Sequence, residues 1–197
     1  MGKWIGIGIV VLVLAAGAAG VSTYNSLVTL DQSVQAQWAQ VENVYQRRAD
    51  LVPNLVETVK GAAAFEKETY TAVAEARAKV GQVNAGDIAN NPEAFARFQQ
   101  AQDGLSSALS RLMVVVERYP DLKATQNFRD LQAQLEGTEN RIAVERMRFT
   151  QAAQAFNTKR MSFPTVLIAG FFGGRFNEKP YFKSQAGAET APKVNFK

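Results

Sequence analysis

Three carboxylate residues early in the polar part of the chain have a spacing that could serve acid–base chemistry. Glu42, Asp50 and Glu57 are seven or eight residues apart, so a helix would place them on one face. Catalysis by paired carboxylates needs opposed groups with separated pKa values in a pocket, and no opposing partner is identifiable. The spacing therefore favours a solvated edge, or one that faces another subunit, over a catalytic pair.

The sequence contains no cysteine and no histidine. Without cysteine, disulfides, thiolate catalysis and sulfur-bound zinc are excluded. Without histidine, the commonest general base and metal ligand are missing, as are the Glu-x-x-His pairs that bind two metals in helical bundles. No Gly-rich phosphate loop or nucleophile elbow is present either. We therefore expect no enzymatic activity, no catalytic or metal-binding residue and no cofactor.

The charge distribution also limits the possible partners. The formal net charge of +4 is small for 197 residues, and basic residues mostly interleave with acidic ones. A protein that reads nucleic acid would show a clustered basic stripe or a recognisable motif. Nucleic acid is therefore not an expected partner.

Three segments carry residues that alternate every four and three positions, and most of these residues are apolar. This seven-residue repeat is typical of long helices that pack side by side. The seam positions are Val34, Trp38, Val41, Tyr45, Arg48, Val52, Leu55 and Val59; Phe95, Phe98, Gln102, Leu105, Leu109, Leu112, Val116 and Tyr119; and Phe128, Leu131, Leu135, Thr138, Ile142, Glu145, Phe149, Ala152 and Phe156. The repeat predicts a helical bundle with Trp38 and the other seam residues in its core.

Arg48 and Glu145 occupy seam positions that the repeat reserves for apolar side chains. Taking a charge out of water costs several kcal/mol unless it is paired and hydrogen-bonded. One hypothesis is that Arg48 meets Glu145 or Glu139 inside the bundle and sets how the helices align. In the alternative, local bending turns Arg48 outward, where its charged end reaches solvent.

The lengths of the segments constrain how the bundle is built. A straight helix over residues 22–83 would be about 93 Å long, against about 40 and 50 Å for the other two segments. Part of it must therefore protrude as a stalk or fold back, with Pro53 and Gly61 as the places to bend. A kink or the loss of one backbone hydrogen bond is expected at Pro53. The next helix is predicted to start at Asn91-Pro92, with asparagine as the cap.

Residues 4–21 form an uncharged apolar run of eighteen residues. Such a run nearly matches the thickness of a bilayer's hydrocarbon core, with Trp4 and Tyr24 where interfacial aromatic residues are expected. A cleaved signal peptide is the competing interpretation, but the basic start is thin and the run exceeds a usual signal core. We expect a retained anchor, and Lys3 favours a cytoplasmic N-terminus with the bundle on the extracytoplasmic side.

Small residues in this run, notably Ala16 and Gly20, have the four-residue spacing that lets two membrane helices approach closely. The alternative is that glycine is simply frequent in membrane helices.

After the last helix, the character of the sequence changes. Residues 163–172 are apolar, end in Phe171 and Phe172, and are too short to span a bilayer. This segment could cap the bundle, lie among lipid headgroups, or contact a neighbouring subunit. The expected organisation is an anchor (1–24), a helical-bundle domain (25–161), an apolar C-terminal segment (162–182) and a flexible tail (183–197).

Several blocks of the sequence closely resemble the LemA family. They are residues 24–31, residues 38–61 (WAQVENVYQRRADLVPNLVETVKG), residues 75–77, residues 119–124, residues 135–143 and residues 191–194 before an aromatic residue. The resemblance runs from the anchor to the C-terminus. It implies a bacterial protein with an N-terminal membrane helix, a helical-bundle domain and no established enzymatic activity. Some family members carry a lipoprotein cysteine after the apolar run, which this chain lacks.

Together these observations predict an all-α protein: a single-pass transmembrane helix followed by an up-and-down bundle of three or four long helices. We expect it in the bacterial cell membrane, in contact with the bilayer. The favoured function is a structural or scaffolding protein that assembles with further copies. The alternative is an accessory subunit that presents its bundle to a membrane protein partner such as a protease or an AAA-type chaperone.

Overall fold

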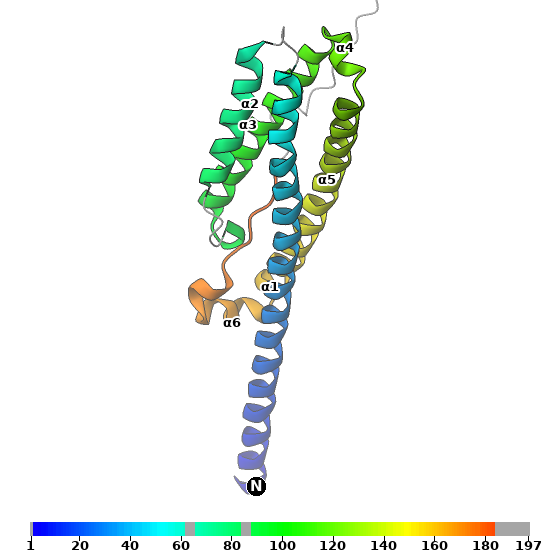
Figure 1. Ribbon diagram of the computed structural model, residues 1–197. Coiled ribbons are helices and arrows are strands. Elements are labelled where there is room, and N and C mark those ends of the chain that lie inside the picture. Colours follow the sequence, from blue (N-terminus) through cyan, green and yellow to red (C-terminus); the bar gives the residue numbers. More distant parts are fainter. Residues whose placement is uncertain (1, 62–65, 84–87, 184–197) are drawn as a thin grey trace, which may run out of the picture.

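The computed structural model describes residues 2–61, 66–83 and 88–183, and these residues form helices and no strands. The elements, in chain order, are α1 (Gly2–Lys60), α2 (Lys67–Gln82), the 3-10 helix η1 (Ile88–Asn90), α3 (Pro92–Val116), α4 (Pro120–Lys123), α5 (Gln126–Met161), α6 (Thr165–Phe171) and the 3-10 helix η2 (Gly173–Phe176). Figure 1 shows α1, α2, α3 and α5 as an up-and-down bundle of four long helices. The predicted fold class is confirmed.

Helix α1 contains both the apolar run that is expected to form the anchor and the first helix of the bundle. Its first part is apolar on every side and exposed, whereas its second part carries the seven-residue repeat and is buried on one face. No break separates the two parts, so the 59 residues extend about 90 Å. Figure 1 shows the N-terminal part of α1 standing clear of the bundle. The protruding stalk and the fold-back that the sequence offered as alternatives both occur.

The chain reverses after Gly61, not at Pro53. Helix α1 continues through Pro53 and ends at Lys60, and α2 then runs back beside α1 and α3. The predicted start of the next helix is confirmed. The Asn91 side chain accepts hydrogen bonds from the Glu93 and Ala94 amides at 3.0 and 3.1 Å, with Pro92 in the first turn.

The seven-residue repeat identified the core well. All eight seam residues from Val34 to Val59 are buried. In the second set, which runs from Phe95 to Tyr119, seven of the eight seam residues are buried and Tyr119 is half-buried. In the third set, Leu131, Glu145 and Ala152 are half-buried and the other six are buried. The repeat predicts burial because residues three and four apart share one face of a helix.

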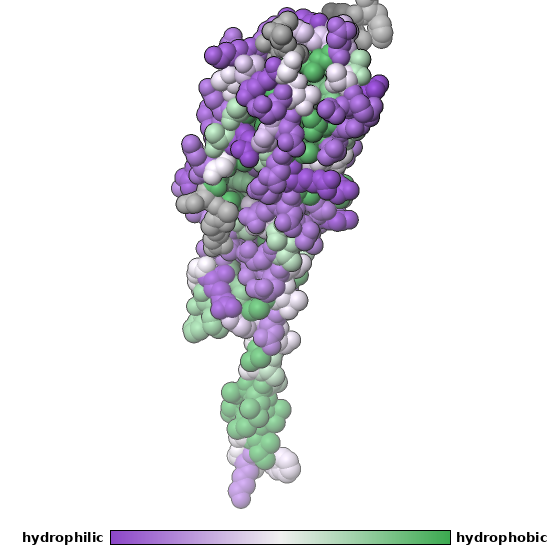
Figure 2. All heavy atoms as spheres, viewed as in Figure 1, coloured by the Kyte–Doolittle hydropathy of each residue, from purple (hydrophilic) through white to green (hydrophobic). Residues whose placement is uncertain are grey.

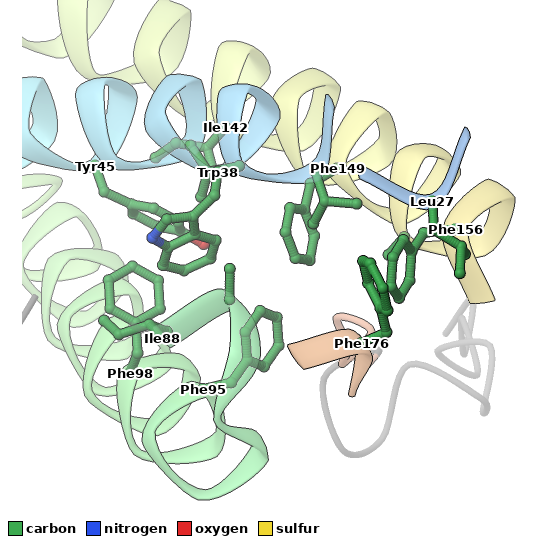
Figure 3. Packing of buried hydrophobic residues seen from close by; sticks show 14 of the residues in the cluster. Leu27, Trp38, Tyr45, Ile88, Phe95, Phe98, Ile142, Phe149, Phe156 and Phe176 are labelled. Atoms are coloured by element: carbon green, nitrogen blue, oxygen red, sulfur yellow. The ribbon is translucent and has the colours of Figure 1, made fainter. Parts of the chain in front are cut away.

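Aromatic side chains fill the part of the core nearer the anchor. The Trp38 ring lies 5.6, 5.2 and 5.4 Å from the rings of Phe95, Phe98 and Phe149. Figure 3 shows Trp38 and Tyr45 of α1 pointing toward Phe95 and Phe98 of α3. The far half of the core is mainly aliphatic, with Val52, Leu105 and Leu112 among its residues. Trp38 thus joins three helices, as its seam position predicted.

Candidate functional site: buried charges and the anchor end of the bundle

Arg48 lies inside the bundle with 1% of its surface exposed, so the alternative in which it turns outward is wrong. Its Nη1 atom donates to Ser106 Oγ at 2.7 Å and to Glu139 Oε1 at 2.8 Å. Its Nη2 atom donates to the backbone and side-chain oxygens of Gln102. The guanidinium also lies over the Tyr45 ring, 5.0 Å from the centroid. Residues from α1, α3 and α5 therefore meet at one cation.

The two glutamates considered as partners of Arg48 have different surroundings. Glu139 pairs with Arg48 although its own side chain is 45% exposed. Glu145 instead pairs with Arg148 on the same helix at 2.9 Å. Among the described residues, no group hydrogen-bonds the buried Oε2 atom of Glu145. The structure thus brings Arg48 to Glu139 and leaves Glu145 out of the cluster.

Burial also affects Tyr45, beside Arg48. Removal from water raises the pKa of the Tyr45 phenol above its usual 10.0, because it disfavours the charged form. The nearby Arg146 and Arg48 act in the opposite direction. Tyr45 therefore stays neutral throughout the physiological range.

Pro53 creates an unusual contact between α1 and α2. Proline has no N–H, so the carbonyl oxygen of Ala49, four residues earlier, lacks its helical donor. The Nε atom of Arg77 donates to this oxygen at 2.9 Å. An arginine from α2 thus replaces the backbone donor missing from α1, which explains how α1 continues through Pro53.

A double-mutant cycle tests this exchange. We expect Arg77→Met to lower the free energy of unfolding by about 1–2 kcal/mol, because a hydrogen bond from a charged group to a half-buried carbonyl is lost. In a Pro53→Ala background, the backbone N–H of residue 53 donates to the Ala49 carbonyl. Arg77→Met should therefore have a clearly smaller effect on the free energy of unfolding in that background. Urea unfolding of the four proteins measures the coupling. Equal effects in both backgrounds would show that Arg77 does not replace the missing donor.

A second buried cation ties the C-terminal part of the chain to the bundle. Lys179 is 1% exposed, and its ammonium group contacts the side-chain oxygens of Asp31 on α1 and Asn90 of η1. The ammonium also lies 4.7 Å from the centroid of the Phe156 ring. The Asn157 side chain on α5 makes two hydrogen bonds to the Lys179 backbone, each of 2.9 Å. Its Nδ2 atom donates to the Lys179 carbonyl, and its Oδ1 atom accepts from the Lys179 N–H.

The residues around Lys179 form a strap, Asn177–Lys183, that crosses the bundle. At its end, Phe182 stacks on Trp38 with 6.4 Å between ring centroids and lies under the Arg146 guanidinium at 4.5 Å. The Lys183 carbonyl accepts hydrogen bonds from Gln99 and Arg146 at 2.9 and 3.0 Å. The strap thereby joins α1, α3 and α5. Residues 184–197, most of the predicted tail, lie outside the described residues.

Helix α6 lies where α1 leaves the bundle, with one face packed and the other open. Its Thr165 and Ala169 are buried, whereas Phe171 is 85% exposed. Phe172 is 44% exposed and contacts Tyr24 of α1, with ring centroids 4.8 Å apart. Packing on the bundle, one of the three fates considered for this segment, therefore accounts for only one face of α6.

Within the described part of the chain, α1 is the one helix long and apolar enough to cross a membrane. Figure 2 shows its apolar stem below the mainly polar surface of the bundle. No group of three or more acidic side chains among residues 2–61, 66–83 and 88–183 is arranged to hold a metal ion.

A sequence profile of the LemA family matches residues 37–196, most of the chain. The chain belongs to the LemA family. The match covers most of the bundle, the Arg48 cluster and the strap, whereas the exposed apolar part of α1 and the residues that follow it as far as residue 36, with Asp31 among them, precede it.

Individual relatives of the chain carry the names MamQ and LemA. The chain is 27% identical to the magnetosome proteins MamQ 1 and MamQ 2 of Paramagnetospirillum magneticum, over 92% of its own length and 72% of theirs. It is 27% identical to magnetosome protein MamQ of Magnetospirillum gryphiswaldense, over 85% of this chain and 67% of that one. Protein LemA of Metamycoplasma hominis is 22% identical, over 74% of this chain and 63% of that one. None of these names states a reaction or a ligand.

Sequence reasoning identified some features of this LemA protein and missed others. Arg48 and Glu139 were singled out because a charge at a seam position needs a partner. Lys179, Asn157 and Arg77 were missed because their roles depend on contacts between distant segments. For Asn157, the sequence held one indication of burial: this residue directly follows Phe156, the last seam residue, on a helix that packs along α1.

Proposed function

We propose that this LemA protein is a non-catalytic, membrane-anchored scaffold whose copies assemble laterally. The observation that carries the proposal is α1, one helix that is exposed and apolar in its first part and forms the bundle core in its second. A helix of this kind confines the bundle to the bilayer surface, where neighbouring copies meet often. Lys3 favours the extracytoplasmic side of the bacterial cell membrane for the bundle.

Two observations support contacts between copies. The spacing of Ala16 and Gly20 would allow two α1 helices to approach closely. A Cβ atom at Gly20 would meet nothing within 4 Å beyond the neighbouring backbone of α1 itself, so no other described segment covers this side of α1.

Size measurement in lipid tests the proposal. We expect the full-length protein in lipid nanodiscs or mild detergent to run larger than a monomer. Replacing both Ala16 and Gly20 with leucine should shift it to the monomer, because the bulkier side chains keep the helices apart. Ala18→Leu is the matched control, since it lies about 200° around the helix from Ala16. A monomeric wild-type protein at all concentrations would remove lateral self-assembly from the proposal.

A groove between α2 and α3 supports the accessory subunit as a second candidate function. The groove has a volume of about 1130 Å³ and small residues in its lining, including Ala72, Ala101 and Gly104. Glu68 and Glu75 lie on its α2 side and Arg97 and Arg111 on its α3 side. Such a groove suits a helix from another protein. Loss of one co-purifying membrane protein from a Gly104→Leu variant that still self-associates would favour this function.

A further inference from the structure

Six large apolar side chains form an exposed surface around α6. This α6 patch consists of Met161, Phe163, Val166, Leu167, Phe171 and Phe172. Phe163 and Phe171 are more than four-fifths exposed, at 81% and 85%. Soluble surfaces seldom gather so many large apolar groups without a partner, because leaving them in water forgoes about 25 cal/mol per Å² of burial.

The orientation of the patch is fixed by the other face of α6. Thr165 and Ala169 are buried where α6 packs against α1 and α5. The Phe172 and Phe176 rings contact the Tyr24 ring, with their centroids 4.8 and 5.5 Å from the Tyr24 centroid. Figure 1 shows α6 projecting from the lower end of the bundle, beside the emerging α1. The patch is therefore held at the anchor end of the bundle.

The position of Tyr24 along α1 sets the height of the patch above a bilayer. Tyr24 follows Val21, the last residue of the apolar run, by three residues, which is about 4.5 Å along the helix. The headgroup layer on each side of a bilayer is about 5–8 Å thick. If residues 4–21 occupy the hydrocarbon core, Tyr24 and Phe172 lie in this layer.

The charges around the patch suit an anionic lipid surface. Lys159 and Arg160 precede it, and Arg175 follows with its guanidinium 5.6 Å from the Tyr24 ring centroid. Glu178 is the single acidic residue in the sequence from Lys159 to Lys183. Apolar side chains flanked by cations are typical of segments that lie in the plane of a membrane interface.

We propose that the α6 patch is a second membrane contact, with its aromatic and aliphatic side chains inserted among the lipid headgroups. The inference rests on the proposed membrane anchor and adds to it. The anchor alone would hold the bundle by one helix, whereas α6 supplies a second point of contact. Two contacts fix which side of the bundle faces the bilayer.

Single labels placed on the full chain test the proposal. Because the chain has no cysteine, Phe171→Cys, Val114→Cys and Leu12→Cys each accept one environment-sensitive fluorophore. The three proteins are reconstituted into vesicles of mixed anionic and zwitterionic phospholipid. Val114 is the matched control, since it is an exposed apolar residue, 69% accessible, at the opposite end of the bundle. The quenchers are iodide in the water and spin-labelled lipid in the bilayer.

We expect the label at residue 171 to be quenched by shallow spin-labelled lipid and protected from iodide. The label at residue 114 should show the reverse, and the label at residue 12 should respond only to deeply spin-labelled lipid. Adding Leu167→Glu should make the label at residue 171 accessible to quenching by iodide, while the label at residue 12 is still quenched by deeply spin-labelled lipid. Zwitterionic vesicles should give weaker lipid quenching at residue 171, because the cations around the patch then lose their attraction.

The other outcomes separate the two proposals. Lipid quenching at residue 12 with iodide quenching at residue 171 would overturn the second contact and leave the anchor intact. Iodide quenching at both residues would overturn the anchor and the second contact together. Protection of residue 171 from both quenchers would show that protein, not lipid, covers the patch. The second membrane contact would then be overturned, and a second copy of the chain would become the partner of the patch.

Discussion

Replacing Glu139 with leucine should lower the free energy of unfolding by about 2–4 kcal/mol. Arg48 is 1% exposed, so the change leaves a buried cation without its anion. This expected loss of stability is no larger than the usual cost of breaking a buried ion pair, because Glu139 is 45% exposed and water partly screens its charge. For a chain of this length, such a loss corresponds to a fall in Tm of roughly 4–16 °C.

The double variant Arg48→Met, Glu139→Leu should be more stable than Glu139→Leu alone, because it removes the unpaired cation together with its partner. Glu136→Leu is the matched control, since Glu136 lies one turn away on the same helix and is exposed. Its expected effect is within about 0.5 kcal/mol. Urea unfolding compares the variants. A double variant less stable than Glu139→Leu would show that Arg48 stabilises the bundle mainly through Gln102, Ser106 and Tyr45.

Replacing Asp31 with asparagine should release the strap Asn177–Lys183 from the bundle. The ammonium of Lys179 is then buried without its carboxylate, and the strap should lose about 3 kcal/mol of binding to the bundle. Amide hydrogens of the strap should exchange roughly a hundredfold faster. The four long helices should keep most of their protection, because the strap is a local unit of stability.

Two further variants sharpen this test. Asp31→Asn with Lys179→Met should restore much of the protection, because the unpaired cation is gone. Glu178→Gln is the control, since Glu178 is the exposed neighbour of Lys179. In a Trp4→Phe background, Trp38 emission reports whether Phe182 has left it. Unchanged exchange in Asp31→Asn would mean that Asn157 and the Phe182 contacts hold the strap without the ion pair.

The predictable part of this fold is the part made of regular helices. The repeat through Val34, Val52 and Leu105 gave the buried faces because burial on a helix follows its period of 3.6 residues. Asn91-Pro92 gave a helix start because a cap depends on residues within one turn. Gly61 and Pro53 were harder to rank as places to bend, because the donor from Arg77 that supports α1 at Pro53 comes from a different helix.

The candidate sites were only partly predictable for the same reason. A charge at the seam position of Arg48 indicated a buried partner, but the choice between Glu139 and Glu145 depends on how α5 is positioned along α1. Lys179 lies in a segment without periodicity, where an isolated lysine normally indicates an exposed surface. Its contact with Asp31 joins residues 148 positions apart, which no local pattern indicates.

The unbroken course of α1 makes the protein a rigid lever. With residues 4–21 in the bilayer, the 36 residues that follow Tyr24 on α1 form an arm of about 54 Å. A tilt of about 20°, ordinary for a membrane helix, would move the far end of this arm sideways by about 18 Å. Because helices tilt when their apolar length exceeds the thickness of the bilayer, a thinner membrane would swing the α4 end of the bundle through the largest arc.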